Sequence, residues 1–196
     1  MTIIETILQM ARQNNGIVTT EVVVAKGIAR GNIKYMENKG LLEKSARGVY
    51  ILPESWENDF CNIQTRFKKG IFSLETALFL WNLSDRTPNY YCMTFPSTYN
   101  LTAAKSQNIL CTQQKNEFYE LGIVEVPTPG GIMVKAYNIE KTLCDIIRSN
   151  KTDIQIITSA FKNYVKLKER NIPLLSEYAK ILNVENKVRN YLEVLI

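Results

Sequence analysis

TTEVVVAKGIARGNIKYMENKGLLEKSARGVYIL, residues 19–52, is the stretch that decides the fold of the first part of this chain. Thr19 predicts the start of a first helix, because its hydroxyl can accept a hydrogen bond from a free backbone amide. Gly27 interrupts that helix and predicts a tight turn. A second helix is expected from about Ala29 to Lys39, and Gly40 is a common C-terminal stop.

Two short apolar segments after Gly40 predict a β-hairpin. Leu41–Leu42 begins the first strand, residues 45–48 form the turn, and Val49–Leu52 forms the returning strand. An amphipathic helix over residues 2–14 and a short strand at Ile17–Val18 are expected before it. Helix, turn, helix and hairpin in this order are typical of a winged helix-turn-helix domain.

The two sides of the second helix differ in their chemistry. Helical spacing gives one side apolar or small residues, which we expect to face the core: Ala29, Ile33, Met36 and Gly40. The other side carries residues that suit a DNA groove: Arg30, Gly31, Lys34, Tyr35 and Asn38. Lys and Arg attract phosphate or guanine, Asn can pair with adenine, and Gly lets a backbone approach closely. Lys44 and Arg47 on the hairpin are expected to contact the flanking DNA. The alternative is a solvated basic helix in an unrelated small fold.

Composition narrows the possible functions. The chain has 196 residues and a net charge of +5, and residues 1–52 contain seven Lys or Arg against four Asp or Glu. It has no histidine, which excludes His-dependent nucleophile pairs and His metal ligands. The four cysteines form no CxxC motif, so neither a metal site nor a cofactor is expected. No secretory signal or membrane-spanning run is visible, which favours a cytoplasmic protein with no membrane partner.

The rest of the chain predicts a second domain. Residues 53–58 (PESWEN) read as a linker, which would divide the chain into domains at 1–53 and 59–196. Strands are expected at Tyr90–Phe95, Ile123–Val126 and Ile132–Tyr137, followed by helices to the C-terminus. The predicted fold class is therefore α+β: a winged helix-turn-helix followed by a mixed-sheet domain with a helical tail.

Three features of the second domain are candidates for chemistry. Glu140, Asp145 and Asp153 lie near the starts or along the faces of helices, and Asp145 is expected to be solvent-exposed. Gly130-Gly131 lacks the GK[ST] ending of a phosphate loop and favours a hairpin turn. The aromatic residues of the strand at 90–95 favour sheet core over base stacking. Catalysis is therefore not expected.

Two basic groups could extend a DNA-binding surface beyond the first domain. Arg66, Lys68 and Lys69 follow the predicted linker. Lys162, Lys166 and Arg170 share one side of a helix predicted over 153–169. An ordinary solvated surface is the alternative for both groups.

The chain resembles the AbiEi antitoxins of type IV (abortive infection) toxin–antitoxin systems. Three segments carry the resemblance: ARGNIKYMENKGLLEKSARGVYIL from Ala29, IFSLETALFLWNLSDRTP from Ile71 with the YYCMTFP strand that follows, and AYNIEKTLCDIIR from Ala136. The resemblance implies an autorepressor that binds inverted-repeat operator DNA, in a bacterial cytoplasm, in a system that confers phage resistance. It also implies an antitoxin that counteracts a nucleotidyltransferase-like AbiEii toxin without a stable complex. Ala29 departs from the family, in which a Ser or Thr cap is expected.

Two other functions remain open from the sequence. The second domain could be a nucleotide-handling enzyme that the first domain only targets to DNA. It could also bind a metabolite and make the protein a ligand-sensing regulator.

Overall fold

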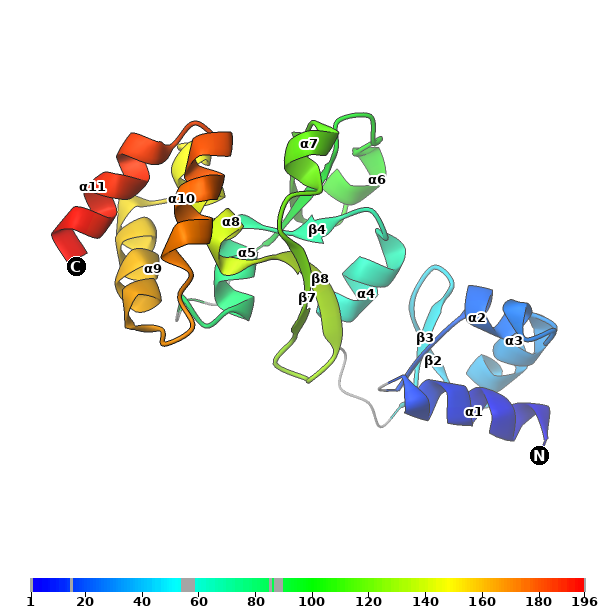
Figure 1. The fold of residues 1–196 in the computed structure, drawn as a ribbon. Coiled ribbons are helices and arrows are strands. Elements are labelled where there is room, and N and C mark those ends of the chain that lie inside the picture. Colours follow the sequence, from blue (N-terminus) through cyan, green and yellow to red (C-terminus); the bar gives the residue numbers. More distant parts are fainter. Residues whose placement is uncertain (1, 15, 54–58, 85, 87–89, 196) are drawn as a thin grey trace. The chain divides into compact units, whose positions relative to one another are not determined.

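The computed structural model describes residues 2–14, 16–53, 59–84, 86 and 90–195 (Figure 1). Residue contacts divide the chain into two compact units, Met1–Lys68 and Lys69–Ile196, which we describe separately. Residues 54–58 of the predicted linker lie outside the described part of the chain.

The first unit combines helices with a small antiparallel sheet. Its elements are α1 (Ile3–Gln13), β1 (Ile17–Thr19), α2 (Thr20–Ala25), α3 (Gly31–Asn38), β2 (Glu43–Ala46), β3 (Val49–Ile51) and α4 (Asp59–Arg66). The strand order is β1-β3-β2, so the strand predicted at Ile17–Val18 is present and pairs with β3 of the hairpin. An apolar cluster joins the first three helices to this sheet; its fully buried members include Ile7, Val23, Ile33, Met36 and Leu42.

The first unit extends further along the chain than the sequence predicts. We expected a new domain from residue 59, but α4 contacts β2 and β3 of the first unit. The buried side chain of Asn62 donates a hydrogen bond of 2.6 Å to the hydroxyl of Ser45 on β2. Residue contacts therefore place the division after Lys68 instead of at 53–58. Composition could not reveal this, because α4 follows a polar segment typical of a linker.

The second unit contains a mixed five-stranded sheet and helices that contact the sheet or follow it in sequence. Its strands are β4 (Ile71–Phe72), β5 (Tyr91–Pro96), β6 (Ile109–Gln114), β7 (Ile123–Pro127) and β8 (Met133–Tyr137). Their order is β6-β5-β4-β8-β7, in which the β5–β6 and β4–β8 pairs are parallel. The α+β class is thus observed in both units.

Helices of the second unit gather mainly after the sheet in sequence. They are α5 (Leu74–Leu80), α6 (Thr102–Lys105), α7 (Asn116–Tyr119), α8 (Ile139–Ser149), α9 (Ile154–Lys166), α10 (Ile172–Ile181) and α11 (Glu185–Leu195). The last four pack together, and α8 contacts α5, α9, α10 and α11 (Figure 1). An apolar cluster that includes Leu143, Phe161 and Leu175 fills the space between them. None of the described helices is long and apolar enough to cross a membrane.

The glycine pair in the second unit forms a hairpin turn, as predicted. Strands β7 and β8 pair from Pro127↔Met133 onward, which leaves a five-residue loop at 128–132. Gly131 has φ +78° and its amide donates to the carbonyl of Thr128 at 2.8 Å. The loop leads into a strand, so it offers no helix N-terminus to a phosphate.

Candidate nucleic-acid interface

The turn between α2 and α3 is fixed by local backbone chemistry. The hydroxyl of Thr19 accepts the amide of Val22 at 3.2 Å, which caps α2 as predicted. Gly27 has φ +76°, a conformation that costs a residue with a side chain more than it costs glycine. The amide of Ile28 then bonds the carbonyl of Val23 at 3.2 Å, and the Ile28 side chain packs against the core. The chain is thereby redirected into α3.

α3 is shorter than the sequence predicts. It begins at Gly31 instead of Ala29 and ends at Asn38. Arg30 occupies the N-cap position without a side-chain cap bond. Ala29 and Gly40, which we expected on the core side, are exposed, because both lie outside the helical segment. Gly40 does stop the helix, with φ +68°.

The two sides of α3 differ in burial and in polarity. Ile33 and Met36 are fully buried. The residues predicted to contact DNA are all exposed: Arg30, Gly31, Lys34, Tyr35 and Asn38. Tyr35 is 49% exposed, and the ammonium of Lys39 lies 5.9 Å from the centroid of its ring. A Cβ added at Gly31 would meet no atom within 4 Å, so open space surrounds this backbone.

The β2–β3 hairpin presents the other two predicted DNA contacts. Lys44 and Arg47 are exposed. The loop consists of Arg47 and Gly48, since Ala46 pairs with Val49, and Gly48 has φ +79°. The carbonyl of Gly48 accepts the amide of Thr20 at 2.9 Å. This bond joins the hairpin loop to the first residue of α2.

The three basic residues at the end of α4 and just after it are divided between the two units. Arg66 and Lys68 end the first unit and Lys69 begins the second. All three are exposed. The ammonium of Lys68 forms an ion pair with Glu21 on α2, and the guanidinium of Arg66 lies 5.5 Å from the centroid of the Phe67 ring. Lys68 therefore has a partner within the protein.

The predicted basic row on the long helix is only partly formed. Lys162 and Lys166 are exposed and one turn apart on α9. The helix ends at Lys166, and Leu167 is extended, so Arg170 lies beyond it. The guanidinium of Arg170 donates to the carbonyl of Leu167 at 3.0 Å. The prediction that Arg170 continues the row is wrong, because the helix stops four residues earlier.

The acids weighed as catalytic candidates have structural partners. Asp145 is buried, although we expected it to be exposed, and it pairs with the fully buried ammonium of Lys141 at 2.5 Å. Gln114 on β6 contacts both, accepting from Lys141 at 3.2 Å and donating to Asp145 at 3.3 Å. Burial lowers the pKa of Lys141, and the Asp145 carboxylate opposes that shift. Helical periodicity predicted an exposed Asp145, and this prediction is wrong because residues 140–147 of α8 are all buried.

The other two acids stabilise the helical part of the second unit. Glu140 accepts hydrogen bonds from the Tyr164 hydroxyl at 3.1 Å and from the amide of Asn171 at 3.3 Å. Asp153 caps α9 by accepting the amide of Gln155 at 2.7 Å. Across the described residues, no group of three or more His, Cys, Asp or Glu is placed to hold a metal ion.

α2 and α3 form a helix pair joined by a glycine turn, and α3 has one apolar face and one basic, polar face. Helix-turn-helix DNA-binding proteins share this arrangement. A comparison with known protein families supports a transcriptional regulator. Residues 5–53 match the model of a family described as "Transcriptional regulator, AbiEi antitoxin". This match supports an antitoxin-type transcriptional regulator and covers α1 through the β2–β3 hairpin.

One solved structure supports the fold over most of the chain. The crystal structure of the RV2827C protein from Mycobacterium tuberculosis is similar with a TM-score of 0.58 and 14% sequence identity. The similarity covers 89% of this chain and 70% of that one. At this identity it establishes the fold alone. No curated protein matches the sequence.

Proposed function

We propose that this protein is an antitoxin and transcriptional autorepressor of a type IV toxin–antitoxin operon. The first unit acts as a winged helix-turn-helix on inverted-repeat operator DNA. It acts in the bacterial cytoplasm and needs no cofactor. The observation that carries the proposal is the exposed basic and polar face of α3, opposite buried Ile33 and Met36, within the segment that matches the regulator family.

The proposed contacts follow from where α3 begins. In a helix-turn-helix, the N-terminal part of the second helix enters the major groove. Arg30 and Lys34 would there meet guanine edges or phosphates, and Asn38 would meet an adenine. Lys44 and Arg47 on the hairpin would hold the flanking backbone. Lys162 and Lys166 of the second unit could add phosphate contacts, since both are exposed.

The proposed antitoxin activity rests on the family match and the resemblance. The partner would be an AbiEii-type nucleotidyltransferase toxin encoded in the same operon, counteracted without a stable complex. The three acids considered as catalytic candidates, Glu140, Asp145 and Asp153, have structural partners, which favours a regulator over a nucleotide-handling enzyme.

Two experiments test these parts separately. The DNA region upstream of the operon is titrated with the protein, and fluorescence anisotropy reports the dissociation constant. Saturable binding that exceeds binding to a scrambled duplex of equal length supports repression. Equal affinity for both duplexes would remove the sequence-specific operator from the proposal.

The second experiment measures protection from the toxin. The neighbouring gene is induced in cells with and without this protein, and colony growth is counted. The variant that combines Arg30→Ala and Lys34→Ala is the control, because it lacks proposed DNA contacts while its second unit is unchanged. Protection by both proteins would show antitoxicity independent of operator binding, and protection by neither would refute the antitoxin assignment.

A further inference from the structure

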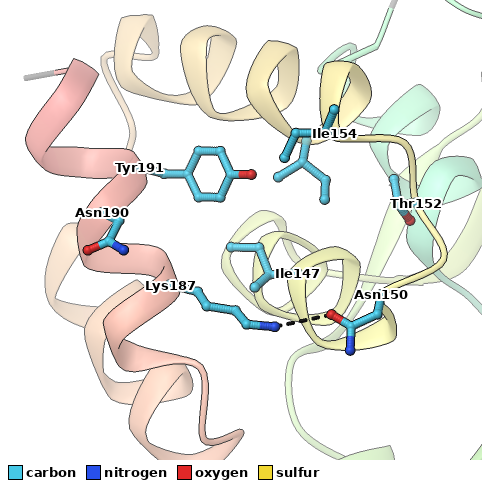
Figure 2. Close-up of a pocket in the computed structure, with 8 residues that line it drawn as sticks. Ile147, Asn150, Thr152, Ile154, Lys187, Asn190 and Tyr191 are labelled. Atoms are coloured by element: carbon cyan, nitrogen blue, oxygen red, sulfur yellow. Dashed lines mark hydrogen bonds between the residues drawn. The ribbon is translucent and has the colours of Figure 1, made fainter.

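The second unit contains a hollow of about 510 Å³ that the DNA-binding proposal does not use (Figure 2). It lies where the end of α8, the start of α9 and one face of α11 meet. Its volume falls within the range of roughly 300–1,000 Å³ that is usual for small-molecule sites. The residues that line it are aliphatic on one side and polar on the opposite side.

The floor and one wall of the hollow are aliphatic. Ile147 of α8 and Ile157 of α9 are buried, and Ile154 at the start of α9 is 63% exposed. An exposed isoleucine beside two buried ones leaves apolar surface in contact with water. A ligand with an apolar body would cover that surface favourably.

The opposite wall is polar and comes from α11. Lys187, Asn190 and Tyr191 are spaced three and four residues apart, so they share one helix face. Figure 2 shows the hydroxyl end of Tyr191 directed toward the isoleucines. The ring of Tyr191 stacks on Phe161 with centroids 4.9 Å apart, which fixes its position.

One cation lies at the rim and has an uncharged partner. The Lys187 ammonium donates to the side-chain oxygen of Asn150 at 3.1 Å (Figure 2). Asn150 ends α8 in the left-handed conformation, with φ +51°. Thr152 adds a hydroxyl beside it. The described residues that line the hollow include no Asp or Glu.

From this arrangement we infer that the hollow binds a small organic anion, with a compact apolar body on the isoleucines and one carboxylate at Lys187. The amide and hydroxyl groups of Asn150 and Thr152 can donate to the same carboxylate, and charge-assisted hydrogen bonds of this kind are the strong ones. The inference goes beyond the proposed function and does not rest on it. The site would stand if operator binding failed.

Octanoate and 1-octanol are the probes, because they share an alkyl chain and differ in charge. Each is titrated into the full-length protein below its micelle or solubility limit while amide NMR shifts are recorded. We expect saturable octanoate shifts that include Asn150, Thr152 and Tyr191, and weaker binding of 1-octanol. Absence of saturation, shifts centred elsewhere, or equal affinity for the two probes would overturn the inference.

Lys187→Met and Lys180→Met form the matched pair of variants. Both lysines are exposed, and Lys180 lies on α10 and does not line the hollow. Loss of a hydrogen bond to a charged group should weaken octanoate binding by about tenfold or more in Lys187→Met. Its 1-octanol affinity and both affinities of Lys180→Met should be unchanged. Equal loss in the two variants would show a general charge effect and refute the assigned site.

Discussion

Arg30 is the residue on which the proposed base contacts depend most. It is exposed at the N-cap of α3 and makes no side-chain cap bond. Arg30→Ala should cost about 1–3 kcal/mol of operator affinity if the guanidinium contacts a guanine. Anisotropy titrations measure the loss. Arg12→Ala is the control, because Arg12 is an exposed cation of the same unit on α1. Unchanged affinity in Arg30→Ala would remove Arg30 from the interface.

The buried pair of Lys141 and Asp145 gives a prediction about stability. Asp145→Asn leaves the ammonium without its carboxylate, and breaking a buried pair typically costs about 3–5 kcal/mol. We expect a correspondingly lower free energy of unfolding in urea. The double variant Lys141→Met with Asp145→Leu should recover much of the loss, since neither charge then remains buried. A single variant as stable as the original protein would show that the pair contributes little.

The buried thiols predict how stability changes at high pH. Burial raises the pKa of Cys144 from 9.0 to about 12 and that of Cys92 from 9.0 to about 11. In the unfolded chain these thiols ionise near 9, before they do in the folded protein. The folded state therefore binds more protons above pH 9, and the free energy of unfolding should fall as pH rises from there. Urea titrations at pH 8 and pH 10 measure the change, and replacing both cysteines with alanine should reduce it.

At the scale of elements, the start of α3 allows the effect of a substitution on stability to be measured apart from its effect on the proposed DNA binding. Gly31 begins the helix in open space, so an added methyl group clashes with nothing in the protein. Gly31→Ala should leave stability equal or higher by up to about 1 kcal/mol. It should weaken operator binding if DNA backbone approaches closely there. Thermal unfolding and anisotropy measure the two effects. Unweakened binding would show that DNA does not approach this part of α3.

The helix α4 is the element that sequence patterns assigned to the other unit. Its contacts with β2 and β3, and the bond from Asn62 to Ser45, indicate that it supports the hairpin. A fragment of residues 1–68 should therefore unfold at higher urea concentration than one of residues 1–53. Equal midpoints by circular dichroism would mean that α4 adds no stability to the first unit.

At the scale of the whole molecule, the charge distribution predicts a strong salt dependence. The net charge is +5, with an excess of three positive charges in residues 1–52. Phosphate contacts release counterions, so the logarithm of the association constant should fall linearly with the logarithm of salt concentration. Lys44→Ala should reduce the slope by about 1 if Lys44 contacts a phosphate. A slope that does not change would place Lys44 away from the DNA backbone.

The sequence by itself determined the local features of the first unit. The Thr19 cap, the Gly27 turn, the Gly40 stop and the pairing of the hairpin depend on side chains and backbone conformations within a few residues. The alternation of buried Ile33 and Met36 with exposed Lys34 and Tyr35 follows from helical geometry alone. For these features the determining interactions are close in sequence, so their pattern could be recognised in the chain.

Only the tertiary structure decided which charges are buried and where the first unit ends. Asp145 was expected in solvent because a helix usually has one free face, but Gln114 of β6 covers that face of α8. α4 belongs to the first unit because it contacts the hairpin, across residues that read as a linker. The hollow between α8, α9 and α11 exists only because these three helices meet. Such contacts join residues far apart in sequence, and no local pattern records them.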